Sequence, residues 1–115
     1  MNTLKNKVQL IGNIGQDPII TNLNEGKIVA RLSLATNESY KNAKGEKVTD
    51  TQWHNIVAWG KIAEIIEKYV KKGKEIAVAG RLVARSYQDK EGVKRSASEV
   101  VITEILLLSS DENTL

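Results

Sequence analysis

The chain has 115 residues, and its 17 Lys and Arg against 14 Asp and Glu give a formal net charge of +3. This length suits one domain, and a hydrophobic share of 41% argues against wholesale disorder. The absence of cysteine excludes disulfides, thiolate zinc sites and a cysteine nucleophile, and a single histidine argues against a histidine-rich metal site. The sequence has neither an apolar run of membrane-spanning length nor a secretory signal, so we expect a soluble intracellular domain.

Short β-rich runs separated by polar turns dominate the sequence. From residue 28 onward the alternation is regular, so that Ile28, Ala30 and Leu32 share one face of a strand. Patterns of this kind predict strands over residues 7–14, 28–35, 51–60, 76–87 and 98–108. After the turn signal Asp17-Pro18, residues 19–23 are expected to continue the first strand on a new heading. Polar tips at residues 24–26 and 88–92 predict hairpin turns.

Two other segments interrupt these strands. Residues 37–50 form a polar stretch of fourteen positions, which predicts a long loop that is functional or mobile. From Ile62 to Val70 the apolar residues recur at helical spacing, which predicts a helix over residues 61–72 that Gly73 ends. Tyr69 shares that spacing with the isoleucines, so we expect it to be structural.

The order of these elements predicts the fold class. An antiparallel meander of this size has edges to hide, and closing the sheet into a barrel hides them. Five strands with a helix between the third and fourth are the order of the OB-fold, an all-β, five-stranded Greek-key barrel. We therefore expect residues 1–108 to form one OB domain, and residues 109–115 to be a short polar C-terminal end.

The third predicted strand holds both tryptophans. Strand alternation places Trp53, Asn55 and Trp59 on one face and His54 and Ile56 on the other. The two indoles are then about 20 Å apart along the strand. Spacing alone is equally compatible with tryptophans in the core. The polar neighbours on their face, and the ample aliphatic residues available for the interior, favour exposed rings.

Aromatic and basic residues occur together elsewhere as well. Arg81, Arg85 and Tyr87 share a face of the fourth strand, and Tyr40 lies beside lysines in the polar stretch. Rings interleaved with cations suit single-stranded nucleic acid, because bases stack on the rings at about 1–3 kcal/mol each while Lys and Arg neutralise phosphates. Each cation taken alone is more often a solvated surface charge.

The sequence offers little for catalysis. His54 has no second histidine or cysteine to work with, and the carboxylates are scattered rather than clustered for metal-dependent nuclease chemistry. The segment Gly12–Gly15 lacks the lysine of a phosphate-binding loop. We therefore expect no catalytic residue, no metal site and no cofactor.

Four segments carry a family resemblance: KVQLIGNIGQDPII, RLSLATNESYKN, TQWHNIVAWGKIAEIIEKYVKKGKEIAVAGRLVARSY and SEVVITEILLL. Together, from Asn6 to Leu108, they resemble the bacterial single-stranded DNA-binding protein (SSB) family. The resemblance implies an OB-fold homotetramer that binds single-stranded DNA without sequence preference in replication, recombination and repair. It also implies a non-enzymatic protein located in the bacterial cytoplasm at the nucleoid.

The resemblance also implies roles for individual residues. Trp53 and Trp59 match the family's base-stacking pair, Tyr40 and Tyr87 occupy positions of stacking tryptophans, and His54 matches a histidine at subunit contacts. Lys61, Lys72 and Arg85 match basic positions along the family's DNA path. Combined with the strand faces, the resemblance predicts a nucleic-acid site formed by Tyr40, Trp53, Asn55, Trp59, Lys61, Lys72, Arg81, Arg85 and Tyr87.

The end of the sequence departs from the family pattern. Typical members continue to an acidic tip that recruits replication and repair proteins, whereas this sequence stops at SSDENTL. We expect that tail to be absent or reduced, in either a natural short form or a fragment. Three alternatives stay open: a primosome-type accessory OB module bridging proteins and DNA, a single-stranded RNA-binding OB domain, and an OB-type nuclease, which the lack of an acidic cluster disfavours.

Overall fold

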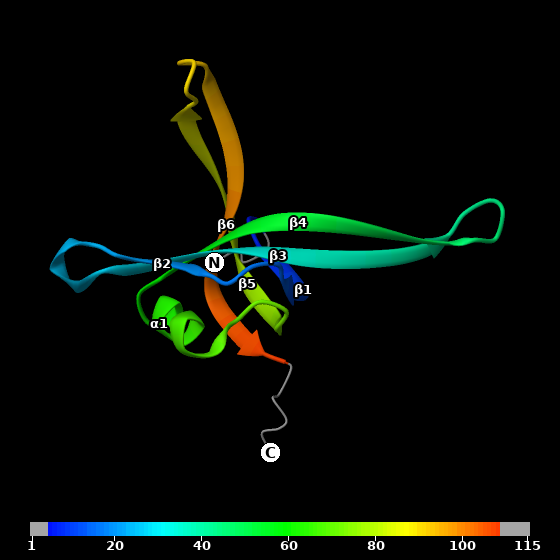
Figure 1. The fold of residues 1–115 in the computed structure, drawn as a ribbon, viewed down its shortest axis with the longest axis horizontal. Coiled ribbons are helices and arrows are strands. Elements are labelled where there is room, and N and C mark those ends of the chain that lie inside the picture. Colours follow the sequence, from blue (N-terminus) through cyan, green and yellow to red (C-terminus); the bar gives the residue numbers. More distant parts are fainter. Residues whose placement is uncertain (1–4, 109–115) are drawn as a thin grey trace.

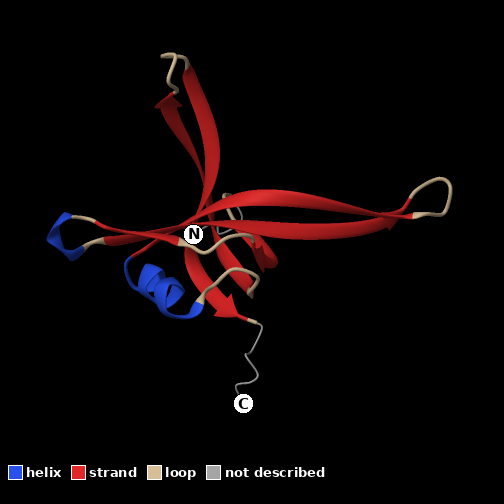
Figure 2. Ribbon diagram, viewed as in Figure 1, coloured by secondary structure: helices blue, strands red, loops and turns tan. Residues whose placement is uncertain are grey.

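The computed structural model describes residues 5–108. The elements in this range are β1 (Val8–Ile14), β2 (Ile19–Asn22), the 3₁₀ turn η1 (Asn24–Gly26), β3 (Ile28–Lys41), β4 (Lys47–Trp59), α1 (Gly60–Tyr69), β5 (Glu75–Gln88) and β6 (Lys94–Leu107). Figure 2 shows strands throughout, with α1 packed to one side. The C-terminal end expected over residues 109–115 lies outside the described residues.

The five long strands close into a barrel in the order β1-β5-β6-β4-β3, and β1 returns to β3 through Asn13 and Ile14. The β4–β6 pairing is parallel, whereas the other pairings around the barrel are antiparallel. The predicted OB-type barrel is confirmed, with α1 between β4 and β5, which are the third and fourth long strands. Residues 19–22 do not continue β1 but form β2, which pairs with β3. Pro18 precedes them and cannot donate a ladder hydrogen bond.

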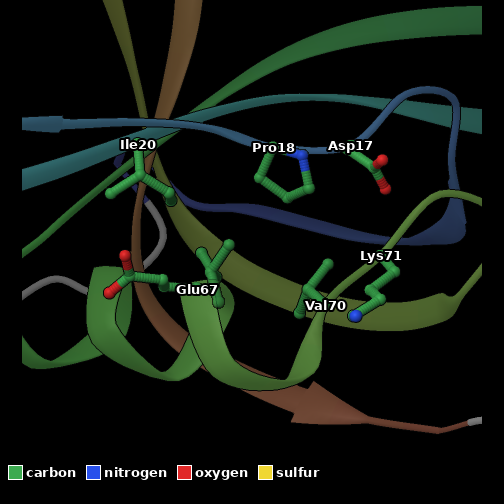
Figure 3. Close-up of a pocket in the computed structure, with 7 residues that line it drawn as sticks. Asp17, Pro18, Ile20, Glu67, Val70 and Lys71 are labelled. Atoms are coloured by element: carbon green, nitrogen blue, oxygen red, sulfur yellow. The ribbon is translucent and has the colours of Figure 1, made fainter.

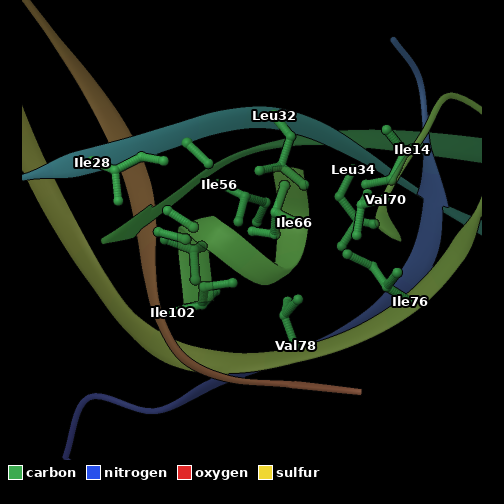
Figure 4. Close-up of a cluster of buried hydrophobic side chains, with 14 residues drawn as sticks. Ile14, Ile28, Leu32, Leu34, Ile56, Ile66, Val70, Ile76, Val78 and Ile102 are labelled. Atoms are coloured by element: carbon green, nitrogen blue, oxygen red, sulfur yellow. The ribbon is translucent and has the colours of Figure 1, made fainter. Parts of the chain in front are cut away.

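Aliphatic side chains fill the barrel interior (Figure 4). Alternation along β3 and β4 delivers Leu32, Leu34 and Ile56 to this core, and α1 packs against it through Ala63 and Ile66. At Gly12 the backbone of β1 runs so close to the carbonyl of Ala35 on β3 that a Cβ atom would collide with it. The close approach of these two strands therefore depends on glycine at position 12.

Two hairpins extend beyond the barrel as long ribbons (Figure 1). The radius of gyration is 16.5 Å, whereas a compact domain of about 100 residues has one near 13 Å. We call the outer half of the β3–β4 hairpin the first arm and the outer half of the β5–β6 hairpin the second arm. Both arms are largely exposed, so cross-strand backbone hydrogen bonds hold them rather than buried side chains.

The prediction of a long loop over residues 37–50 is wrong, because most of this segment is paired strand. β3 and β4 remain paired from Thr36↔Gln52 out to Lys41↔Lys47, and a short tip joins them. In the tip, the Oδ1 atom of Asn42 accepts the backbone N–H groups of Lys44 and Glu46 at 2.9 and 3.0 Å. In a two-stranded ladder the backbone N–H and C=O groups bond across the strands whatever the side chains are. The polar sequence therefore gave no alternation from which these strands could be predicted.

The helix is shorter than expected, because it ends at Tyr69 with Val70 as its C-cap. Ile66 and Val70 of the predicted apolar stripe are buried, whereas Ile65 is exposed. Tyr69 is exposed on the outer side of α1, so the expectation that it packs in the core is wrong. The segment from residue 70 to residue 74 returns the chain to β1: the Gly73 N–H donates to the Ile14 carbonyl oxygen at 2.8 Å.

Candidate nucleic-acid interface

Both indole rings lie on the outside of the barrel, on the face of β4 that points away from the core. Trp53 is 62% exposed and Trp59 is 47% exposed, whereas Ile56, on the opposite face of the strand, is buried. The alternative that placed the tryptophans in the core is therefore wrong. Asn55 lies between the two rings on the same outer face and is also exposed.

The register of the sheet extends this outer face over four strands. Arg31 pairs with Val57, Val57 with Val101, and Val101 with Arg81, so one row crosses β3, β4, β6 and β5. Side chains in one such row lie on the same face of a sheet. We call this surface, defined by Arg31, Trp53, Asn55, Trp59, Arg81, Arg85, Glu99 and their neighbours in register, the outer face.

Arg81 and Arg85 on β5 therefore share the outer face with the tryptophans. Tyr87 follows two residues later on the same side of the second arm and is exposed. Its cross-strand partner is Arg95, whose Nε atom donates to the Oδ2 atom of Asp89 at 2.7 Å. A cation is thus held beside the ring of Tyr87.

Asp89 organises the tip of the second arm. Its Oδ1 atom accepts the N–H groups of Glu91 and Val93 at 3.0 and 2.9 Å. The hydrogen bond from Arg95, followed by the one from Val93, lowers the pKa of the Asp89 carboxyl below its ordinary value. The carboxylate is thus the form that the folded tip prefers.

Trp53 rests against the backbone at the end of β1. A Cβ atom placed on Gly15 would lie 2.8 Å from the Cη2 atom of the indole. The Gly15 N–H donates to the carbonyl oxygen of Ser33 at 3.0 Å, which fixes this support to β3. The ring is therefore exposed to solvent on one side and supported from below on the other.

Lys72 belongs to the segment that packs beside this support. Its backbone N–H donates to the Oδ1 atom of Asp17 at 2.8 Å, and the following Gly73 bonds to Ile14, next to Gly15. Lys61 lies in the first turn of α1, two residues after Trp59, and is exposed. Lys61 is therefore close to Trp59 in the chain, and the backbone of Lys72 is bonded to Asp17, two residues after the Gly15 support of Trp53.

Tyr40 does not share the outer face. It pairs with Val48, and its position on β3 has the parity of Leu32 and Leu34, which point into the barrel. Tyr40 is therefore an exposed ring on the reverse side of the first arm. The prediction placed it in one site with the tryptophans, but strand parity separates them.

The sequence reasoning did not identify the acidic centre of the outer face. The Oε2 atom of Glu99 on β6 accepts hydrogen bonds from the Nη1 atoms of Arg31 at 2.7 Å and of Arg85 at 3.3 Å. Strand alternation was the one indication for Arg31 in the sequence, since it places this residue on the face opposite the apolar residues Ala30 and Leu32. No sequence pattern pointed to Glu99, because its partners Arg31 and Arg85 are 68 and 14 residues away in the sequence.

The predicted subunit residue His54 has the parity of Ile56 and is partly buried. Its Nε2 atom lies 3.0 Å from the Oγ1 atom of Thr36. Within residues 5–108 no three His, Cys, Asp or Glu residues gather as a possible metal site. Over the same residues, no helix has the length and apolar character needed to cross a bilayer.

A cleft of about 180 Å³ lies apart from the outer face, between α1 and the chain around Pro18 (Figure 3). It is lined by apolar residues, Pro18, Ile20, Ile66 and Val70, and by charged residues of both signs, Asp17, Glu67 and Lys71. It offers neither a cluster of cations nor an exposed ring. The residues predicted to bind nucleic acid therefore occupy an open surface instead of this pocket.

Known proteins resemble this chain in both sequence and structure. The model of the Single-strand binding protein family matches residues 5–108. Single-stranded DNA-binding protein 1 of Chlorobaculum tepidum is 42% identical over 109 residues, which is 94% of this chain and 67% of that protein. The single-stranded DNA-binding protein of Neisseria meningitidis is 40% identical over 110 residues, covering 95% of this chain and 63% of the relative. The chain thus spans about two thirds of the length of these relatives.

A solved structure of the Plasmodium falciparum SSB in complex with ssDNA superposes on this fold with a TM-score of 0.81 and 34% identity. The match covers 95% of this chain and 100% of that one. The fold, the family match over nearly all described residues and the 40–42% identical relatives agree. The chain belongs to the single-strand binding protein family.

Proposed function

We propose that this chain binds single-stranded DNA without sequence preference and protects it during replication, recombination and repair. The observation that carries the proposal is the pair of exposed indoles, Trp53 and Trp59, on a barrel face that also presents Arg81 and Arg85. The match to an SSB solved with ssDNA supports the same function.

In this proposal the aromatic rings stack on bases and the basic side chains neutralise phosphates. Every base has a π-face, so Trp53, Trp59 and Tyr87 accept any sequence, and alanine substitution in strand-binding OB proteins costs about 1–3 kcal/mol per stacked base. Lys61, Lys72, Arg81 and Arg85 neutralise phosphates and release counterions, which adds affinity without sequence information. Asn55 supplies an amide between the rings. In a duplex the base faces are stacked and inaccessible, so only the phosphate contacts would contribute to its binding.

Tyr40 enters the proposal differently from the other rings. It lies on the reverse side of the first arm, so a strand reaches it only by passing around the arm or by lying on another copy of the chain. We therefore assign Tyr40 to a peripheral contact and the other predicted residues to the main path.

The proposal includes assembly into a homotetramer. One row across the barrel, Ile11↔Ala77↔Leu106, leaves two large aliphatic side chains exposed, and symmetric association would cover them. We assign His54 to a subunit contact. Sedimentation that gave only a 12.7 kDa species at micromolar concentration would refute the assembly but leave strand binding intact.

We infer that the protein acts by binding and not by catalysis, at the nucleoid in the bacterial cytoplasm. Replication and repair proteins are proposed partners. A bridging accessory module would show weak strand binding and tight protein partners. A nuclease would degrade labelled strands in the presence of a divalent metal.

Titration with oligo-dT tests the function directly. We expect tryptophan fluorescence to be quenched at micromolar strand, and increasing salt to weaken the binding. Matched duplex DNA should compete poorly. Absence of quenching at low salt would refute the proposal, and tighter binding of oligo-U than of oligo-dT would favour the RNA alternative.

A further inference from the structure

We propose that Arg31, Glu99 and Arg85 form a phosphate clamp, in which the Glu99 carboxylate holds two guanidinium groups together so that both contact one phosphate of the bound strand. The inference rests on the proposed function and adds two residues to it, Arg31 and Glu99. Arg31 becomes a phosphate contact and Glu99 a positioning residue.

The clamp is defined by two short contacts to one atom. The Nη1 atoms of Arg31 and Arg85 lie 2.7 and 3.3 Å from the Oε2 atom of Glu99. The two nitrogens are therefore no more than about 6 Å apart, a separation at which like charges repel unless an anion lies between them. The carboxylate supplies that anion.

The accessibility of the three side chains fits this division of roles. The side chain of Glu99 is only 14% exposed, whereas those of Arg31 and Arg85 are 41% and 52% exposed. A guanidinium has five N–H donors, so each arginine keeps free donors after bonding to Glu99. The acid is thus shielded from an incoming strand while the cations face it. The three groups carry a net charge of +1, which one phosphodiester neutralises.

The clamp lies between the two stacking platforms. Along β3, the partners of Trp59, Val57 and Trp53 are Val29, Arg31 and Ala35. Arg31 therefore occupies a row between those of the two indoles on the same face. A strand whose bases stack on both rings would span this row, so that its phosphates would pass the two guanidinium groups.

Two pairs of variants test the clamp, with oligo-dT affinity measured over a range of NaCl concentrations. Arg31→Met removes the proposed phosphate contact but retains an aliphatic stem. Lys68→Met, on the exposed side of α1, is its control for the loss of one positive charge. We expect Arg31→Met to make the slope of log K against log[NaCl] shallower by about 0.7, the value for one single-strand phosphate contact, and Lys68→Met to leave it unchanged.

Glu99→Gln is compared with Glu104→Gln, an exposed acid on the same strand, because both raise the net charge by one. Release of the two guanidiniums should make Glu99→Gln bind on the order of fivefold more weakly than Glu104→Gln. In the Arg31→Met background the difference should fall below about twofold, because no clamp is left to organise.

Three outcomes would overturn the clamp. Arg31→Met could retain the parent salt slope, Glu99→Gln could bind as tightly as Glu104→Gln, or both could lower only the melting temperature, as a purely structural brace across three strands would. If Glu99→Gln does not fold, the salt slope of Arg31→Met still decides. Failure of the parent chain to bind oligo-dT would refute the proposed function itself, which keeps the two failures distinguishable.

Discussion

Replacing Trp53 with alanine tests whether this ring stabilises the core or binds a base. Because Trp53 is 62% exposed, less than half of an indole surface of roughly 200 Å² is removed from water on folding. At about 25 cal/mol per Å², the substitution costs at most about 2 kcal/mol of stability. A domain stable by about 5–15 kcal/mol remains folded after that loss.

Strand binding should weaken measurably although the protein stays folded. Loss of one stacked base is expected to weaken oligo-dT binding by about 1–3 kcal/mol, which is roughly a 5- to 150-fold increase in Kd. Because the substitution removes a fluorophore, the assay is the anisotropy of a dye-labelled oligo-dT at fixed salt. Circular dichroism melting of the same samples reports the stability.

Ile56→Ala is the matched control on the opposite face of the same strand. Ile56 is 1% exposed, so its truncation leaves a core cavity that costs about 2–5 kcal/mol of stability. Below its melting temperature this variant should bind oligo-dT within about twofold of the parent chain, because no stacked base is lost. The reasoning would be refuted by a Trp53→Ala protein that fails to fold, or by one that folds and binds like the parent.

Three further predictions concern the glycine supports and the second arm. Gly15→Ala should push the Trp53 ring off its backbone support, shifting its emission and weakening oligo-dT binding with little change in melting temperature. Gly12→Ala, where the new Cβ would meet the backbone of β3, should instead lower the melting temperature markedly, and an unchanged value would contradict the close approach. Because the pKa of Asp89 is lowered in the folded state, its stabilisation of the tip is present above its ordinary pKa and is lost as the pH falls through the lowered value. Amide hydrogen exchange of residues 88–94 should therefore accelerate under acid more than that of the barrel, after correction for intrinsic rates.

The elements with a strong apolar pattern were predictable from the sequence. The 3.6-residue spacing of isoleucines predicted α1, and the two-residue alternation in β3 and β4 predicted which side chains fill the barrel. Alternation placed Trp53 and Trp59 on one face but did not decide their exposure. The polar neighbours on that face, and the supply of Ile56 and Ala58 to the interior, indicated that the rings are exposed, as they are.

The first arm was not predictable from the same signals. Its strands alternate polar with polar, so no periodicity marks them, and their ladder is set by the register that begins inside the barrel. The placement of Tyr40 depended on that register. Once the pairing continues without a bulge to Lys41↔Lys47, parity fixes the ring on the reverse side.

The contacts of Glu99 required knowledge of the closed sheet. Arg31 reaches it from β3 across β4, which is possible because β4 and β6 run parallel with Ile56 opposite Val100. Spacing within one strand cannot reveal a contact that depends on how three strands are set beside one another. Local patterns therefore predicted which aromatic side chains are exposed, whereas the ion pairs of Glu99 depended on tertiary register.

The two indole rings owe their positions to backbone elements and not to deep burial. Trp53 lies on Gly15, and Trp59 immediately precedes Gly60, whose positive φ of 64° turns the chain from β4 into α1. Because the Trp53 ring is supported on one side, it would lose little rotational freedom on stacking against a base, so ordering the ring would cost little of the stacking energy. Because L-residues with side chains adopt such a φ only with strain, a substitution at Gly60 should weaken strand binding by reorienting Trp59, although position 60 carries no side chain that could touch the strand.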